Sequence, residues 1–221
     1  MRRILVLRPE PGASATARKI SGLGLEAIVV PLFEIEPVAW EAPDPSRFDG
    51  LLLTSAQALR VGGQELRRLR GLKVYAVGEA TAEAARAAGF DIAAIGEAGV
   101  EQLLGAVGTD LRLLHLCGED RKALDGATQS IRQMVVYRST AIRTPDLSGI
   151  SGSVALIHSP RAGRRLAELV DDRSSIAIAA ISAAAADAAG HGWESSRAAQ
   201  SSTDDALLAL AARLCNNPPP E

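Results

Sequence analysis

The sequence predicts an α/β protein of two similar parallel-sheet domains, which a two-stranded antiparallel ribbon joins. Short apolar runs bounded by turn-forming residues are typical of strands that are buried on both faces. Two such runs, at 51–53 and 154–157, are each followed by a pattern with the period of a helix. Two other segments, at 33–40 and 135–144, alternate apolar and polar residues, which is typical of strands with one exposed face.

The first domain begins with a strand at 4–7, a helix at 13–23 and a second strand at 25–30. A strand–helix–strand unit of this kind predicts parallel strands. The alternating segment 33–40 and the proline-containing segment 41–45 then lead out of this first sheet.

Residues 48–134 alternate between predicted strands and helices four times. The strands are expected at 48–53, 72–77, 92–95 and 111–116, and the last helix is expected at 121–130. The second alternating segment, 135–144, is the natural antiparallel partner of 33–40. We therefore expect a discontinuous domain of residues 1–32 and 144–221, an inserted domain of residues 44–134, and a linker of residues 33–43 and 135–143.

An internal repeat supports two copies of one α/β unit. The stretch 72–90 contains a strand, a glycine turn, an alanine-rich helix and a closing glycine, and 175–193 repeats that order. Ser55 and Ser159 therefore occupy equivalent positions, each between the end of a predicted strand and the start of the helix that follows it. Hydroxyls and helix-start N–H groups at that edge of an open α/β sheet point toward bound ligands.

Composition limits the classes of function. The chain has 221 residues, 47% hydrophobic content and a net charge of −2, so the overall charge does not suggest a nucleic-acid partner. Cys117 and Cys215 form no C-x-x-C pair and have no histidine cluster beside them, so we expect no metal. The apolar run at 4–7 is too short for a secretory signal, and no run is long enough to span a bilayer. We expect a cytoplasmic monomer.

Several motifs in order resemble the uroporphyrinogen-III synthase family. They are LRP (7–9), LTSAQAL (53–59), AVGEATAEAARAAGF (76–90), LCGEDRKAL (116–124), VYRST (136–140) and HSP (158–160). The resemblance implies two α/β domains facing each other across a cleft, joined by a two-stranded ladder and working without a cofactor. It also implies the reaction: hydroxymethylbilane, a linear tetrapyrrole, is closed to a macrocycle with inversion of its last ring.

The resemblance indicates candidate site residues, as does the position of several polar side chains at the ends of predicted strands. Tyr137 is the candidate catalytic residue, because a phenol with an ordinary pKa of about 10 stays protonated at neutral pH and can donate to the departing hydroxyl. The substrate carries several carboxylates, which hydroxyls and arginines at strand ends can bind. The candidate substrate-binding residues are Arg8, Ser55, Thr81, Arg121, Ser159 and Arg161.

Each of these candidate residues could instead have a purely structural role. Ser55 and Ser159 are either ligand contacts or helix caps, and Tyr137 could simply pack on the ribbon. Arg8 could hold the proline-rich turn after the first strand, and the other two arginines could be solvated. We expect His158 to be structural and His115, inside a buried strand, to belong to no ligand set.

The sequence also departs from the family pattern. Residues 182–185 lack the Gly-x-x-Thr that the family often has there, because Ser182 and Ala185 stand in its place. Ser202-Thr203 stands where the family often has Pro-Thr. A non-catalytic two-domain module that binds an anionic small molecule, or a family member with impaired activity, therefore remains the alternative function.

Overall fold

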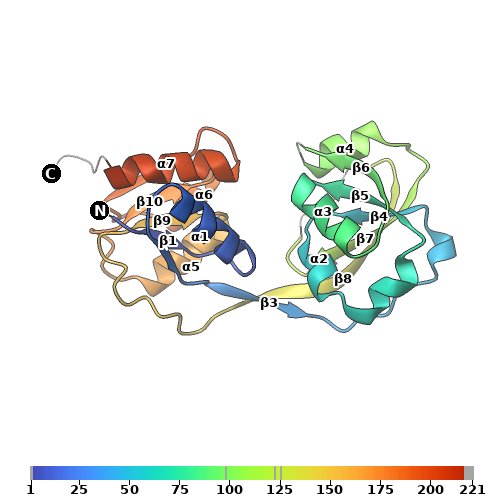
Figure 1. The fold of residues 1–221 in the computed structure, drawn as a ribbon, viewed down its shortest axis with the longest axis horizontal. Helices are drawn as coiled ribbons and strands as arrows, with labels where there is room; N and C mark the ends of the chain where they lie inside the picture. Colours follow the sequence, from blue (N-terminus) through green and yellow to red (C-terminus); the bar gives the residue numbers. More distant parts are fainter. Residues whose placement is uncertain (1, 98, 122, 125, 217–221) are drawn as a thin grey trace. The chain divides into compact units, whose positions relative to one another are not determined.

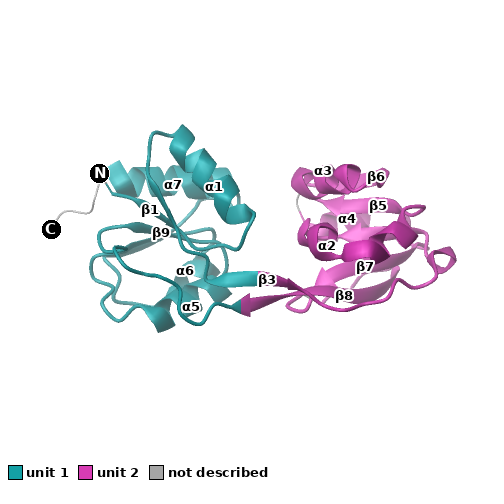
Figure 2. Ribbon diagram, turned by 60° about the horizontal axis from the view of Figure 1, so that its bottom comes forward, with its two compact units in different colours: residues 1–34, 141–221 teal, residues 35–140 magenta. Residues whose placement is uncertain are grey.

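The computed structural model describes residues 2–97, 99–121, 123–124 and 126–216. The chain forms two compact units, shown in two colours in Figure 2. Unit 1 consists of residues 1–34 and 141–221, and unit 2 consists of residues 35–140. The fold is mixed α/β with two separate, mostly parallel sheets, as the sequence predicted.

Unit 1 contains a five-stranded sheet in the order β11-β10-β9-β1-β2. The strands are β1 (Ile4–Val6), β2 (Ala27–Val29), β9 (Val154–Ile157), β10 (Ala177–Ala180) and β11 (Ser195–Ala198). Neighbouring strands of this sheet pair in parallel, and Ile4 of β1 lies between Ala27 and Val154. Strands from the two ends of the chain therefore lie side by side, blue β1 next to orange β9 (Figure 1).

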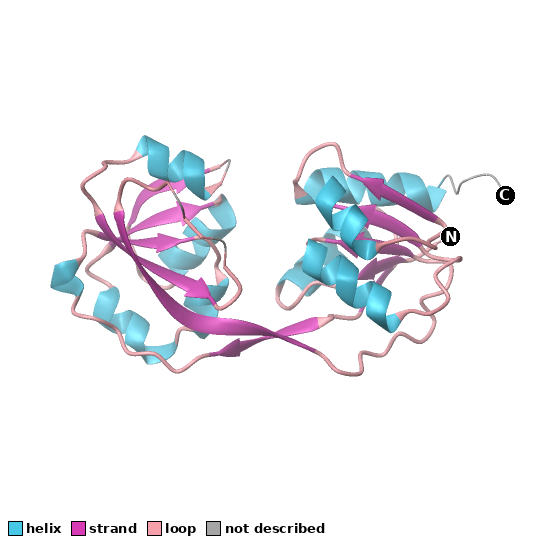
Figure 3. Ribbon diagram, turned by 180° about the vertical axis from the view of Figure 1, so that it is seen from behind, coloured by secondary structure: helices cyan, strands magenta, loops and turns pink. Residues whose placement is uncertain are grey.

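Helices cover both faces of this sheet (Figure 3). They are α1 (Gly12–Gly22), α5 (Pro160–Leu169), α6 (Ala183–Ala189) and α7 (Asp204–Asn216). Leu5 and Leu7 face α5 and α6, whereas Ile4 and Val6 face α1 and α7. The alternation of side chains along a strand explains why a wholly apolar run was needed here.

Unit 2 is built around a six-stranded sheet in the order β3-β8-β7-β4-β5-β6. The strands are β3 (Phe33–Pro37), β4 (Gly50–Leu53), β5 (Lys73–Val77), β6 (Ile92–Gly96), β7 (Arg112–Gly118) and β8 (Ser130–Ala141). The helices are α2 (Gln57–Val61), α3 (Glu79–Ala87) and α4 (Val100–Ala106), with short 3-10 helices at Pro45–Arg47 and Gly63–Leu69. One apolar cluster joins α2 and α3 to Leu51 and Leu53, and a second joins α4 to Leu52 and Leu113 on the opposite face.

The two units share one topology. The order β8-β7-β4-β5-β6 in unit 2 corresponds to β2-β1-β9-β10-β11 in unit 1. In unit 2 these strands follow one another along the chain, whereas in unit 1 the counterparts of β7 and β8 come first in the sequence. The internal repeat predicted from the sequence is therefore present in the fold.

The two alternating segments pair as predicted. β3 and β8 are neighbours in the sheet of unit 2. The Val38 amide donates to the Val136 carbonyl over 3.0 Å, and Arg138 Nε donates to Glu36 Oε2 over 2.7 Å. The residue numbers run in opposite directions along these contacts, so the pair is antiparallel.

The second alternating segment begins earlier than predicted. β8 starts at Ser130, and its first half pairs in parallel with β7, from Arg112 opposite Ser130 to Gly118 opposite Tyr137. The helix expected at 121–130 is wrong: none of the described residues in that range is helical. Gln129 is buried there, and its Nε2 donates to the carbonyls of Leu104 and Gly108, which ties residue 129 to the C-terminal end of α4.

Candidate functional site

Unit 2 has a pocket at the carboxyl ends of β4 and β7. From β4 the chain proceeds to β5 and β6 on one side, then returns through α4 to β7 on the other side of β4. Such a reversal of strand order opens a crevice in which α/β proteins bind ligands. The pocket has a volume of about 410 Å³. It is lined by Thr54, Ser55, Val77, Gly99, Val100, Glu101, His115, Cys117, Gly118, Asp120, Arg121, Leu124 and Tyr137.

Tyr137 joins this pocket from the second half of β8. Its side chain is half-buried and forms a hydrogen bond with the Ser55 side chain. Burial raises the pKa of the Tyr137 phenol above its ordinary value of 10.0, while the bond to Ser55 acts in the opposite direction. The phenol is therefore protonated at neutral pH and able to donate a proton.

The position of the Tyr137 ring depends on a glycine in the neighbouring strand. A Cβ at Gly118 would lie 2.7 Å from Cε2 and 2.8 Å from Cζ of Tyr137. These distances are well inside van der Waals contact, so only a residue without a side chain lets the ring lie against β7. Gly118 and Ser55 thus fix the ring and the hydroxyl of Tyr137, respectively.

His115, in the buried strand β7 as expected, is also among the residues that line this pocket. Its side chain is 2% exposed, and its Nε2 lies 3.1 Å from Thr54 Oγ1. Burial lowers its pKa to about 4, with the positive charge of Arg121 adding to the effect, so the imidazole is neutral at physiological pH. The other ring nitrogen, Nδ1, is buried and has no hydrogen-bond partner. A single histidine inside an apolar strand is not a sequence pattern that indicates a pocket residue.

The charged lining of the pocket is mixed. Arg121 is exposed, and it donates through Nε to Gln133 Oε1 over 2.8 Å and through Nη1 to the Glu119 carbonyl over 3.1 Å. The carboxylates of Glu101 and Asp120 also line the pocket. Burial raises the pKa of the Cys117 thiol, which is therefore neutral.

Three of the predicted site residues meet in this pocket: Ser55, Arg121 and Tyr137. Thr81 does not line it. Thr81 is 5% exposed in the first turn of α3, whose buried neighbours Ala82 and Ala85 belong to the opposite apolar cluster.

The remaining predicted residues lie in unit 1. The Ser159 hydroxyl oxygen caps α5 by accepting from the Ala162 amide over 3.2 Å. The Arg161 guanidinium stacks 4.4 Å from the centre of the Phe33 ring. Arg8 has contacts of its own, with Asp204 and Thr16.

Asp204, at the start of α7, contacts basic side chains from three other segments of the chain. Its Oδ1 lies 3.2 Å from Arg8 Nη1 and 3.2 Å from His158 Nε2, and its Oδ2 lies 3.2 Å from Lys19 Nζ. The hydrogen bond from His158 is the main cause that lowers the pKa of Asp204 to about 2. Arg8 Nη1 also lies 3.4 Å from Thr16 Oγ1. Arg8 and His158 thus each have partners within unit 1, and those of Arg8 lie in α1 and α7.

The positions that depart from the family pattern have clear local roles. The Ser182 hydroxyl oxygen caps α6 by accepting from the Ala185 amide over 3.3 Å, and Ala185 itself is fully buried. Thr203 Oγ1 accepts from the Ala206 amide over 3.3 Å at the start of α7. Both hydroxyls therefore act as helix caps.

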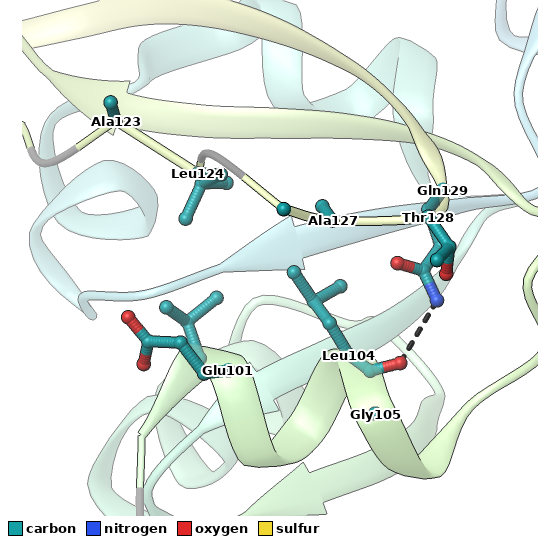
Figure 4. Close-up of a pocket in the computed structure, with 10 residues that line it drawn as sticks. Glu101, Leu104, Gly105, Ala123, Leu124, Ala127, Thr128 and Gln129 are labelled. Atoms are coloured by element: carbon teal, nitrogen blue, oxygen red, sulfur yellow. Dashed lines mark hydrogen bonds between the residues drawn. The ribbon is translucent and has the colours of Figure 1, made fainter.

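A smaller pocket of about 200 Å³ adjoins the first along α4 (Figure 4). Glu101 and Leu124 line both pockets. Gln129 closes one end of the smaller pocket through its bond to the Leu104 carbonyl. Its other amide atom, Oε1, is buried without a partner.

Within the described ranges, no group of three or more His, Cys, Asp or Glu side chains is placed to hold a metal ion. Over the same ranges, none of the helices has the length and apolar character needed to cross a membrane.

The fold and the pocket define a class: α/β proteins with two doubly wound units of one topology and a pocket at a switch point of one sheet. Comparison with known proteins identifies the family. The family model described as "Uroporphyrinogen-III synthase HemD" matches residues 14–209. The chain belongs to the uroporphyrinogen-III synthase family, and the resemblance inferred from its motifs is confirmed.

Individual relatives agree with this assignment. A uroporphyrinogen-III synthase of Chlorobaculum parvum is 35% identical over 92 residues, which make up 38% of this chain and 37% of that relative's length. The crystal structure of uroporphyrinogen-III synthetase from Helicobacter pylori 26695 has a TM-score of 0.68 at 18% identity, covering 97% of this chain and 100% of that one. A mutant uroporphyrinogen III synthase from the extremely thermophilic bacterium Thermus thermophilus has a TM-score of 0.53 at 17% identity, covering 98% of this chain and 99% of that one. At these identities the two structures show a common fold.

Proposed function

We propose that this protein is a uroporphyrinogen-III synthase. It is a cyclising lyase that converts hydroxymethylbilane to uroporphyrinogen III with inversion of the last pyrrole ring, in the biosynthesis of tetrapyrroles such as haem, sirohaem and cobalamin. Family membership over residues 14–209 supports the proposal. The observation that best supports the proposed chemistry is the protonated phenol of Tyr137, which is hydrogen-bonded to Ser55 and lines a pocket of about 410 Å³.

The reaction demands orientation more than chemical activation. A pyrrole nitrogen of the bilane expels the neighbouring hydroxyl, which takes up a proton and leaves as water, and an azafulvene cation remains. The cation closes unaided at the free carbon of the last ring and gives the uninverted isomer. The protein must direct it to the substituted carbon instead, through a spiro intermediate that reopens and closes inverted. Holding reacting atoms in such a geometry is a major source of rate enhancement.

Tyr137 is proposed as the proton donor to the departing hydroxyl. Its raised pKa keeps the proton available at neutral pH, and the bond to Ser55 sets the direction of the hydroxyl. The phenolate left behind recovers its proton when the inverted ring loses one on regaining aromaticity. General acid catalysis of this kind contributes about 10²–10⁴ in rate.

Ser55 and Arg121 are proposed to bind substrate in the same pocket, since both line it. Substrate contacts by Arg8, Thr81, Ser159 and Arg161 stay predictions. We further propose that the protein acts in the cytoplasm as a monomer, with hydroxymethylbilane as its partner and without a cofactor.

One assay tests the activity. Freshly prepared hydroxymethylbilane is incubated with and without the protein, and the macrocycles are oxidised and separated by isomer. We expect mainly the inverted isomer with protein and the uninverted one without it. Binding of the bilane with an unchanged isomer ratio would instead favour the non-catalytic binding module.

Substitution Tyr137→Phe tests the role of the phenol. We expect turnover to fall several-fold to about a hundredfold, because one proton donor is lost while the substrate's own nitrogen still drives departure. The product should remain largely inverted, since orientation depends on the whole site. Thermal unfolding of the variant serves as the control for folding. An unchanged rate would make Tyr137 a packing residue, and complete loss in a folded variant would show that its role is larger than proposed.

A further inference from the structure

The Ser55 side chain connects the proposed acid to the main chain. Its Oγ accepts a hydrogen bond from the Gln57 amide over 3.2 Å, and its hydroxyl is hydrogen-bonded to the Tyr137 phenol. A serine oxygen can accept twice and donate once. The bond from Gln57 uses an acceptor position, so the proton of the Ser55 hydroxyl stays available for the phenol. A main-chain amide, a hydroxyl and the phenol therefore lie in one hydrogen-bonded chain.

The direction of the bond between Ser55 and Tyr137 is fixed once Tyr137 has given up its proton. A neutral phenol can donate to serine or accept from it, whereas a phenolate oxygen can only accept. The proton in the bond must then come from Ser55. Because a hydrogen bond to an ionised group is about twice as strong as one between neutral groups, the bond to Ser55 stabilises the phenolate more than the phenol.

The rest of the pocket makes this stabilisation important. Burial and the nearby Cys117 both raise the pKa of Tyr137, so both disfavour the phenolate, and the bond to Ser55 acts against them. Arg121 is exposed and hydrogen-bonded to neighbours of its own. The ionisable groups that line the pocket together with Tyr137 are Glu101, His115, Cys117, Asp120 and Arg121. A donor on the phenolate oxygen therefore supplies what the half-buried phenol needs when it acts as an acid.

We propose that Ser55 is a positioning residue for the acid step: it orients the Tyr137 phenol and donates to the phenolate that forms when the phenol gives its proton to the departing hydroxyl. The phenol O–H bond breaks, the proton joins the leaving hydroxyl to give water, and the proton of Ser55 stays on Ser55. The Gln57 amide holds the Ser55 oxygen in place. This inference rests on the proposed synthase function, and it adds a role through Tyr137 to the substrate contact proposed for Ser55.

Titration of Tyr137 tests the bond without using activity. The protein has two tyrosines, so a sample labelled with ¹³C at Cζ of tyrosine gives two signals, and Tyr137→Phe identifies that of Tyr137. We expect the pKa of Tyr137 to be higher in Ser55→Ala than in the wild type, because the phenolate loses a donor. Ser55→Thr keeps the hydroxyl and should stay close to the wild type. An equal or lower pKa in Ser55→Ala would overturn the inference whatever the activity of the protein.

Turnover of hydroxymethylbilane gives a second, kinetic test. We expect kcat of Ser55→Ala to fall about tenfold, which corresponds to one lost hydrogen bond to a charged group, and Ser55→Thr to recover much of this loss. If Ser55 acts through the phenol, adding Ser55→Ala to Tyr137→Phe should lower kcat by less than about twofold. A fall in kcat that is equally large in both backgrounds would overturn the inference.

Ser151→Ala is the matched control. The Ser151 hydroxyl is likewise hydrogen-bonded to another hydroxyl, that of Ser175 over 2.9 Å, but it is exposed and belongs to unit 1, whereas Tyr137 belongs to unit 2. This variant should leave the titration of Tyr137 unchanged and keep kcat within about twofold of the wild-type value. Thermal unfolding checks the fold of each variant, and Ser55→Gly, which removes the same hydroxyl, replaces Ser55→Ala if the latter does not fold.

Failure of the inference can be told from failure of the proposed function. A wild-type protein that forms no inverted isomer would reject both. A wild-type protein that forms the inverted isomer, with a pKa of Tyr137 that Ser55→Ala leaves in place, would reject the role of Ser55 alone. Equal kcat values of the wild-type and Ser55→Ala proteins would do the same.

Discussion

The contact between Gly118 and Tyr137 gives a quantitative prediction for Gly118→Ala. The new Cβ would lie 2.7 Å from Cε2, 2.8 Å from Cζ and 3.1 Å from the hydroxyl oxygen of Tyr137. Since favourable carbon contacts begin near 3.5 Å, the ring must move by roughly 0.8 Å. Such a shift stretches the hydrogen bond to Ser55 and turns the phenol away from its set direction.

The expected consequence is a functional loss larger than the loss of stability. A displacement of this size in a catalytic group costs up to about a hundredfold in rate, so we expect kcat to fall roughly ten- to a hundredfold. Crowding of the ring costs about 1–3 kcal/mol in the free energy of unfolding, partly offset because alanine suits a strand better than glycine.

The assay is the isomer-resolved turnover of hydroxymethylbilane by four proteins: wild type, Gly118→Ala, Tyr137→Phe and the double variant. If Gly118 acts by positioning the phenol, adding Gly118→Ala to Tyr137→Phe should lower kcat by less than about threefold. Gly22→Ala is a matched control, because a Cβ there meets no atom within 4 Å. Wild-type kcat in Gly118→Ala, or full additivity of the two substitutions, would refute the reasoning.

Two further predictions concern unit 1. A Cβ at Gly163 would lie 2.8 Å from the Ala185 carbonyl oxygen of α6, so Gly163→Ala should force the helices apart and lower the free energy of unfolding by about 1–3 kcal/mol, measured by urea denaturation. The pKa of Asp204 is lowered to about 2 in the folded state, so its stabilisation is complete above its unfolded value near 3.8 and is lost as the pH falls through 2. Asp204→Asn should therefore cost about 1–2 kcal/mol at pH 7, and the difference from wild type should shrink by about pH 2.5. A gap that persists at low pH would show that the His158–Asp204 contact matters for packing and not for charge.

Local patterns were sufficient for most of the strands. The runs that became β4 and β9 are apolar on both faces, and any arrangement that exposed one face would be costly, so a buried parallel strand was the only favourable outcome. The repeat of strand, glycine turn and alanine-rich helix likewise predicted a shared topology. Motif resemblance placed Ser55, Arg121 and Tyr137 in the candidate site, and the structure brings these three to one pocket.

Local patterns failed where the favourable contacts are distant in sequence. The strand β11 has the sequence SSRA and is mostly exposed, so it has no pattern of apolar residues from which a strand could be predicted. It is a strand because it pairs with β10. The helix expected at 121–130 is absent from the described residues of that range because other contacts are more favourable there. Gln129 donates a hydrogen bond to the Leu104 carbonyl of α4, and β8 pairs with β7 from Ser130 onward.

The sequence by itself determined the α/β class, the repeat and the family, because each depends on short-range order of residue types along the chain. Only the tertiary structure decided the neighbours of the functional groups. It brought His115 to Thr54 across 61 positions and Arg8 to Asp204 across 196 positions. Burial lowers the pKa of the His115 imidazole, and contacts with His158, Lys19 and Arg8 lower the pKa of the Asp204 carboxyl. Both shifts arise from atoms that come together only when the sheets form.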